Sequence, residues 1–165
     1  MKKMIFAATV LAYCLLVSIS SNAQEGIDVP QPVKESFNGQ FKNSDYQRWV
    51  KLHDMYVATY SVGGTWKDAY FGEDGEFKGV GKFITLDLLP VFAMQSITEK
   101  YPDYEVFELY QYECLENGVC FYAVLKNDKH ELMIKMSSNG EVTYSQRTRI
   151  KGTRVAGTDI AINKK

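Results

Sequence analysis

The residues best suited to chemistry in this 165-residue chain are Cys114 and Cys120, which flank an Asn-Gly turn in the stretch "CLENGVC". Such a pair could bind a metal, exchange electrons or form a structural disulfide. A zinc site needs three or four converging ligands, and neither His53 nor His130 stands in a metal-binding spacing. We therefore expect no metal and no cofactor. If the chain is exported, an even pair of cysteines favours a disulfide.

Other candidate catalytic groups lack the context that catalysis needs. The segment Gly72–Glu76, "GEDGE", clusters carboxylates without the ligand spacing of a calcium loop, so we interpret it as a solvated hairpin turn. The sequence contains no GxSxG nucleophile motif and no glycine-rich phosphate loop. We predict no catalytic residues and no enzymatic activity, and these absences argue against the alternative of an uncharacterised hydrolase.

The N-terminus is typical of a secretory signal peptide. Two lysines precede the apolar run Ile5–Ile19, and small residues end at Ala23, which predicts cleavage there and a signal peptide over residues 1–23. The apolar run is shorter than the roughly 20 residues that a membrane span needs, which favours a cleaved signal over a membrane anchor. A lipoprotein linked through Cys14 is disfavoured because the bulky Tyr13 precedes it.

The chain that remains after cleavage has 142 residues, which suits one compact domain or two small ones. The signal removes two of 19 basic residues and none of 20 acidic ones, which leaves a net charge of −3. This balance argues against a nucleic-acid partner. No later stretch resembles a membrane span, so we expect a periplasmic or secreted protein without membrane attachment after cleavage.

The sequence repeats itself once. The first block recurs with an offset of 60 and the later blocks with an offset of 65, so the second unit has gained five residues around "CLENGVC". The matching stretches are "VPQPVKESFNGQFKN" (29–43) with "LPVFAMQSITEKYPD" (89–103), "YVATY" (56–60) with "FYAVL" (121–125), and "EDGEF" (73–77) with "SNGEV" (138–142).

Each unit begins with a helix signal, an early proline followed by apolar residues at a spacing of four. These residues are Val33, Phe37 and Phe41 in one unit, and Ala93, Ile97 and Tyr101 in the other. Alternating runs separated by glycine turns follow, which predicts three or four antiparallel strands per unit. We predict an α+β fold of two tandem helix-plus-antiparallel-sheet repeats, 24–86 and 87–150, with 151–165 as a tail or edge strand.

The pattern "VPxxVxxSF" followed by strands and a "DGE" hairpin, repeated behind a signal peptide, resembles the PepSY-like family of exported bacterial proteins. The resemblance covers about Val29 to Arg149. It implies a β-lactamase-inhibitor-protein-like fold, a module without a known catalytic centre, and relatives suspected of binding or inhibiting other proteins. The five-residue insertion and the cysteine pair depart from the simplest repeat, and no contact residue of a specific inhibitor carries over.

The repeat also assigns strand faces, because equivalent positions should share burial and strand side chains alternate. We assign the rows around Ala58 and Ala123, together with Trp49, Phe107 and Leu109, to the helix side. The opposite face then mixes charges, including Glu108 and Lys135, with aromatic rings. Its candidate partner-binding residues are Arg48, Trp66, Asp68, Tyr70, Tyr110, Tyr112 and Tyr122.

Tyrosine, tryptophan and arginine are favoured at protein interfaces, so this face predicts a partner. Strands also favour aromatic residues without any partner, and two sheets could bury these rings against each other. We predict a non-catalytic, exported protein-binding or inhibitor-like module whose partner is an unknown protein or peptide. The alternative is a periplasmic small-ligand or envelope-stress sensor with a cleft between the repeats.

The hairpin around "CLENGVC" predicts a specific strand register. A three-residue loop, Glu116–Gly118, would pair Leu115 with Val119 and bring Cys114 opposite Cys120. A non-hydrogen-bonded pair of this kind has a separation that suits a disulfide.

Overall fold

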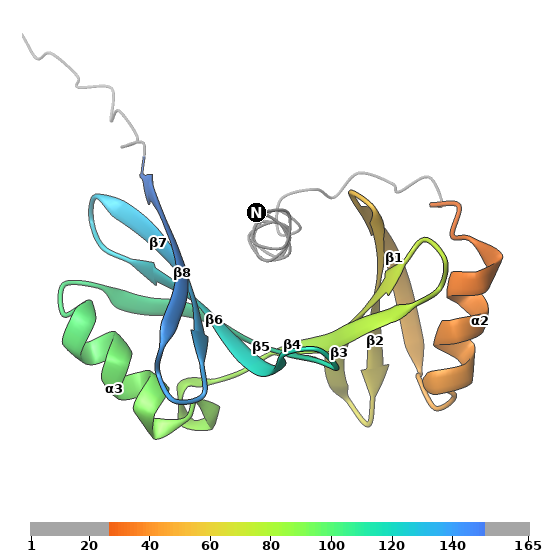
Figure 1. Cartoon of the computed structure of the whole chain (residues 1–165), viewed down its shortest axis with the longest axis horizontal. Coiled ribbons are helices and arrows are strands. Elements are labelled where there is room, and N and C mark those ends of the chain that lie inside the picture. The colour runs from red at the N-terminus through yellow and green to blue at the C-terminus, as the bar shows by residue number, and fades with distance from the viewer. Residues whose placement is uncertain (1–26, 151–165) are drawn as a thin grey trace, which may run out of the picture.

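A computed structural model describes residues 27–150 (Figure 1). The predicted signal peptide (1–23) and the C-terminal tail (151–165) lie outside the described residues. Among the helices of residues 27–150, none combines the length and the apolar character of a membrane span. The elements, in chain order, are α2 (Gln31–Gln40), β1 (Tyr46–Leu52), β2 (Met55–Val62), β3 (Thr65–Gly72), β4 (Phe77–Phe83), the 3-10 turn η2 (Leu86–Leu88), α3 (Val91–Lys100), β5 (Glu105–Cys114), β6 (Gly118–Lys126), β7 (His130–Ser137) and β8 (Val142–Arg149).

The eight strands of the described residues form one antiparallel sheet, in the order in which they occur along the chain. Strand β4 pairs with β5, with Gly81 opposite Tyr112 and Phe83 opposite Tyr110, so main-chain hydrogen bonds join the two halves. The prediction of two separate sheets is therefore wrong. The physical reason is that β4 and β5 would otherwise be edge strands, and their pairing satisfies backbone groups that separate sheets would leave exposed.

Helices α2 and α3 pack against the same face of this sheet. Helix α2 buries Val33 and Phe37, and α3 buries Ala93 and Ile97, as the spacing of four predicts. Phe37 lies at the centre of an aromatic cluster, and the Trp49 ring is 5.3 Å from it between centroids. The α2 half and the α3 half thus have separate apolar cores on one side of a shared sheet.

The two halves use the same strand register. In the first half Tyr70 pairs with Gly79, and the next pair is Phe71 with Phe77, which marks a β-bulge. The second half has the same irregularity 65 residues later, where Lys135 pairs with Tyr144 and Met136 with Val142. A bulge inserts one extra residue into a strand and bends it. The bend therefore falls at matching places in β4 and β8.

The helix-side assignment is confirmed for the rows around Ala58 and Ala123, which are both fully buried in the cores under the helices. It is wrong for Phe107. A register shift between Val106 and Glu108 turns Val106 toward the core instead. Phe107 is 57% exposed, and the Lys126 ammonium lies 3.3 Å from the centre of its ring. Alternation fails there because the bulge interrupts it.

Candidate binding face

The sheet bends so that α2 and α3 lie on its outer side and its other face is concave (Figure 1). We call the sheet surface turned away from both helices the concave face. Strand alternation from the helix-side residues places the seven predicted partner-binding residues on it. Their strands of origin are β1 for Arg48, β3 for Trp66, Asp68 and Tyr70, β5 for Tyr110 and Tyr112, and β6 for Tyr122.

A hydrogen-bonded network crosses the middle of the concave face. The Tyr110 hydroxyl donates to Asp68 Oδ2 at 2.8 Å, and the Thr59 hydroxyl donates to Asp68 Oδ1 at 2.7 Å. The Tyr70 hydroxyl lies 2.8 Å from the Tyr110 hydroxyl. A hydroxyl has one proton, so Tyr70 donates to Tyr110 while Tyr110 donates to Asp68. The network links β2 and β3 of the first half to β5 of the second.

This network requires glycine at position 81 of β4, the strand between β3 and β5. A Cβ atom on Gly81 would clash with the Tyr110 ring, so the ring lies directly over the bare backbone of β4. Only in this way does the Tyr110 hydroxyl reach across β4 to Asp68. Glycine inside a strand commonly marks such a close approach.

Tyr112 extends the aromatic layer beside the network. Its ring packs edge-on against Tyr70 with centroids 5.3 Å apart, and its hydroxyl donates to the Lys78 carbonyl oxygen at 3.1 Å. Burial raises the pKa of the Tyr112 hydroxyl well above its usual range. The group is therefore neutral at physiological pH, as donation to a carbonyl requires.

Tyr122 lies in a neighbouring apolar cluster with Tyr110, Cys120, Val124 and Met133. Burial also raises the pKa of the Tyr122 hydroxyl above its usual range. The three tyrosines Tyr70, Tyr110 and Tyr122 are at most 3% exposed. They form the buried floor of the concave face and are not part of its solvent-exposed surface.

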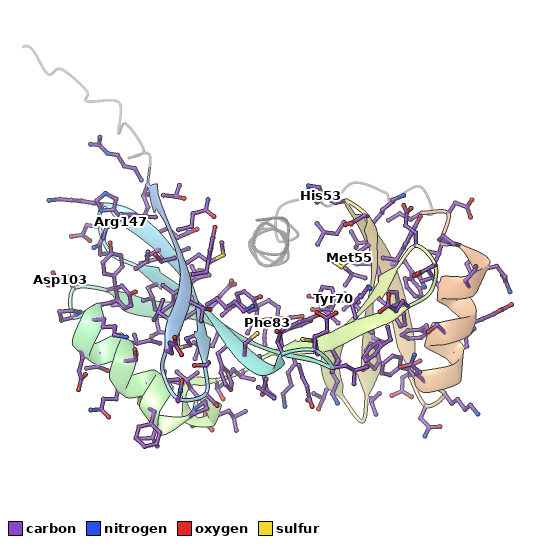
Figure 2. The ribbon with its side chains drawn as sticks, viewed as in Figure 1. His53, Met55, Tyr70, Phe83, Asp103 and Arg147 are labelled. Atoms are coloured by element: carbon purple, nitrogen blue, oxygen red, sulfur yellow. The ribbon has the colours of Figure 1, made fainter. Side chains whose placement is uncertain are left out.

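Other residues of the concave face are exposed to solvent, and two of them are aromatic. Trp66 is 55% exposed and Phe83 is 52% exposed, and Arg48 is also exposed. Continuing the register of β3 and β4 past its last pair, Asp68 with Gly81, places Trp66 across from Phe83. Figure 2 shows Phe83 and Tyr70 near the middle of the molecule. We call Arg48, Trp66 and Phe83 the rim.

Phe83 is the rim residue that the sequence reasoning missed. Its ring packs edge-on against Tyr110, with centroids 5.0 Å apart. Extending the alternation along β4 would have found it, because Gly79, Gly81 and Phe83 share one side of that strand.

The strand register predicted for the cysteine hairpin is wrong, and the structure contains no disulfide between Cys114 and Cys120. Cys114 pairs with Gly118, Cys120 pairs with Tyr112, and both thiols are free. The register differs because Gly118, with φ of 65°, is the first residue of β6 rather than the last residue of the loop. The cysteines are therefore diagonal across the hairpin, and diagonal sites are farther apart than directly opposed ones.

The segment "GEDGE" forms a hairpin turn, as predicted, and two of its carboxylates form ion pairs with nearby lysines. Glu73 pairs with Lys51 at 2.9 Å, and Glu76 pairs with Lys78. Asp74 Oδ1 accepts the backbone N–H of Glu76 at 3.0 Å, which closes the turn. Among residues 27–150, no three histidine, cysteine, aspartate or glutamate side chains come together to hold a metal.

Solved structures to which this chain is similar include three proteins from Bacteroides. A candidate periplasmic protein of B. eggerthii is 18% identical, with a TM-score of 0.67 over 73% of this chain and 89% of that one. A DUF2874 family protein of B. ovatus is 15% identical, with a TM-score of 0.68 over 74% and 89%. A BLIP-like protein of B. fragilis is 14% identical, with a TM-score of 0.65 over 78% and 92%.

No protein-family model and no curated protein matches the sequence. At these identities the structural likenesses show the fold. The chain has a BLIP-like fold, which confirms the β-lactamase-inhibitor-protein-like architecture that the family resemblance implied.

Proposed function

We propose that this protein is an exported, non-catalytic module that binds another protein or a peptide through its concave face. The observation that carries the proposal is the exposure of Trp66 and Phe83 above a floor of buried, hydrogen-bonded tyrosines. Tryptophan and arginine are enriched among residues that dominate binding energy, and phenylalanine is enriched at interfaces.

The floor supports this function because it holds Phe83 of the rim in place before a partner arrives. Tyr70, Tyr110 and Asp68 are fixed to one another across β3 and β5, and Phe83 packs on Tyr110. A surface that is ordered in advance loses less conformational entropy on binding. Arg48 adds a positive charge at the β1 side of the face.

Export to the periplasm or the exterior rests on the N-terminal sequence, and one structural relative is described as a candidate periplasmic protein. Membership in the PepSY-like family stays a prediction. We further propose that the two halves are copies of one helix-and-four-strand unit. The constant offset of 65 between the bulges of β4 and β8 supports this.

No observation favours the alternative of a ligand sensor with a cleft between the units. Within residues 27–150, strands β4 and β5 pair directly where that cleft was expected. A sensor should gain thermal stability from its ligand by mass action, which a small-molecule extract would reveal.

The proposal is tested by affinity capture from periplasmic extract with quantitative mass spectrometry. The variant Trp66→Ala/Phe83→Ala should lose the partners that the wild-type protein enriches. Phe92→Ala is the matched control, because Phe92 is 66% exposed but lies on α3, on the opposite side of the sheet. Equal capture by the rim variant and the wild-type protein would contradict the proposal.

A further inference from the structure

Strand β8 is an edge strand with a long exposed side. Within residues 27–150 it pairs with β7 alone, and its side chains are mostly exposed from Thr143 to Arg149. Edge strands present unpaired N–H and C=O groups that can accept another strand. Among the described residues, one backbone row of β8 therefore has no neighbouring strand.

Strand β4 is the counterpart of β8 in the first half, and it shows which kind of strand can pair at this position. The bulge of β4 against β3 recurs in β8 against β7, 65 residues later, so Lys82 corresponds to Arg147. On the edge away from β3, strand β4 pairs with the antiparallel strand β5, with Lys82 opposite Gln111. The same geometry on β8 would place an added antiparallel strand with one of its residues opposite Arg147.

The charges of β8 restrict the chemistry of that strand. Arg147 pairs with Leu132 and Arg149 pairs with His130, so the two arginines lie two residues apart on the helix side of the sheet. Both are exposed, and neither forms an ion pair with any described residue. Figure 2 shows Arg147 in the half of the molecule that carries α3. Two basic side chains at alternate positions match carboxylates at alternate positions of an extended peptide.

A second copy of the chain fits this edge poorly. Strand β1 is the counterpart of β5, and the offset of 60 makes Lys51 equivalent to Gln111. Pairing β1 of another copy with β8 in the manner of β4 and β5 would set Lys51 opposite Arg147. Like charges directly opposite one another destabilise a strand pair. Charge complementarity with Arg147 and Arg149 favours a different, acidic chain as the occupant.

We propose that β8 binds an extended segment of a partner protein by strand addition, with acidic side chains two residues apart facing Arg147 and Arg149. Main-chain hydrogen bonds hold the segment in place, and the two arginines select its charge. This edge is separate from the rim on the concave face, so binding there does not depend on the function proposed above.

The probe is a fluorescent peptide, Thr-Glu-Val-Glu-Val-Thr, titrated against the full chain as exported and followed by anisotropy. A second peptide replaces both glutamates with lysine, and a third carries methyl groups on alternate backbone nitrogens. We expect the acidic peptide to bind about tenfold more tightly than the lysine peptide, with added salt reducing the difference. The methylated peptide should not bind, because its methyl groups replace the N–H hydrogens on the edge of the peptide that would face β8.

Protein variants locate the site. Arg147→Glu/Arg149→Glu should reverse the preference between the acidic and lysine peptides, whereas Lys34→Glu/Lys42→Glu on exposed positions of the α2 region should not. Amide hydrogen exchange should slow in β8 when the acidic peptide is bound. Trp66→Ala should bind this peptide as the wild-type protein does, which separates the two proposals.

Three results would overturn the proposal. Equal binding of the methylated peptide would reduce the interaction to charge attraction. Unchanged exchange in β8 would place the peptide elsewhere. Without peptide, the β8 amides could become more protected from exchange as the protein concentration rises. That result would show that a second copy of the chain occupies the edge.

Discussion

The hydroxyl groups of Tyr70 and Tyr110 lie 2.8 Å apart, although forty residues separate them along the chain. Tyr110 belongs to the half with α3, and Tyr70 belongs to the half with α2. Their contact passes over the bare backbone of Gly81. Together with the pairing of β4 and β5, it joins the two halves and fixes the floor under Phe83.

The substitution Tyr110→Phe should destabilise the fold. It removes the donor to Asp68 and the acceptor for Tyr70 in a buried place, where an unmet hydrogen bond costs about 1–3 kcal/mol. Urea unfolding should show a lower midpoint at an unchanged slope. Tyr144→Phe is the control, since its hydroxyl bonds to Gln146 on the exposed surface. Equal losses in the two variants would contradict the role of the network.

The substitution Gly81→Ala should also destabilise the protein, because the new methyl group would clash with the Tyr110 ring. Overpacking of this kind costs about 1–3 kcal/mol. Gly39→Ala is a matched control in α2, where nothing lies within 4 Å of the added atom. That change should stabilise the helix by roughly 0.5–1 kcal/mol. A neutral Gly81→Ala variant would mean that the ring does not lie over β4.

Much of the fold could be predicted because alternation and helical spacing are local signals. The helix stripe through Val33 and Phe37 and the buried rows around Ala58 and Ala123 follow from residue type and parity alone. Because the pattern repeats, each strand face could be inferred from two sequence segments. The prediction failed for Phe107 because a bulge changes the alternation of side chains without a clear sequence signal.

The candidate site was predicted only in part because its contacts are tertiary. No local sequence pattern predicts that β4 pairs with β5. The network of Asp68, Tyr70 and Tyr110 therefore could not be derived from residue spacing. The cysteine register failed for a related reason. The glycine of an Asn-Gly turn can stand in the loop or begin the next strand, and Gly118 does the latter.

The free thiols predict ordered alkylation without reductant. Cys114 is partly exposed and should react first, whereas Cys120 is buried. Burial raises the pKa of the Cys120 thiol, so its reaction should become appreciable only at a higher pH than for an ordinary cysteine. Peptide mapping after timed iodoacetamide treatment measures both rates. Protein that takes up no label until it is reduced would show that the thiols are not free.

Stability should decline in strong alkali. Burial raises the pKa of Tyr60 in the folded protein to about 12, while an unfolded tyrosine titrates near 10. The folded state therefore holds a proton that the unfolded state releases, and the free energy of unfolding falls as pH rises from about 10 to about 12. Urea midpoints measured across this window, with tyrosinate absorbance in parallel, test the effect. Constant midpoints would contradict it.

The central claim, that the rim of the concave face contacts a partner, is tested most directly by photocrosslinking in the exporting cell. A photoreactive phenylalanine analogue replaces Phe83 in one version of the protein and Phe92 in the other. Both side chains are more than half exposed, at 52% and 66%, but they lie on opposite sides of the sheet. We predict a discrete covalent adduct from position 83 and none from position 92. An adduct from position 92 alone would contradict the claim.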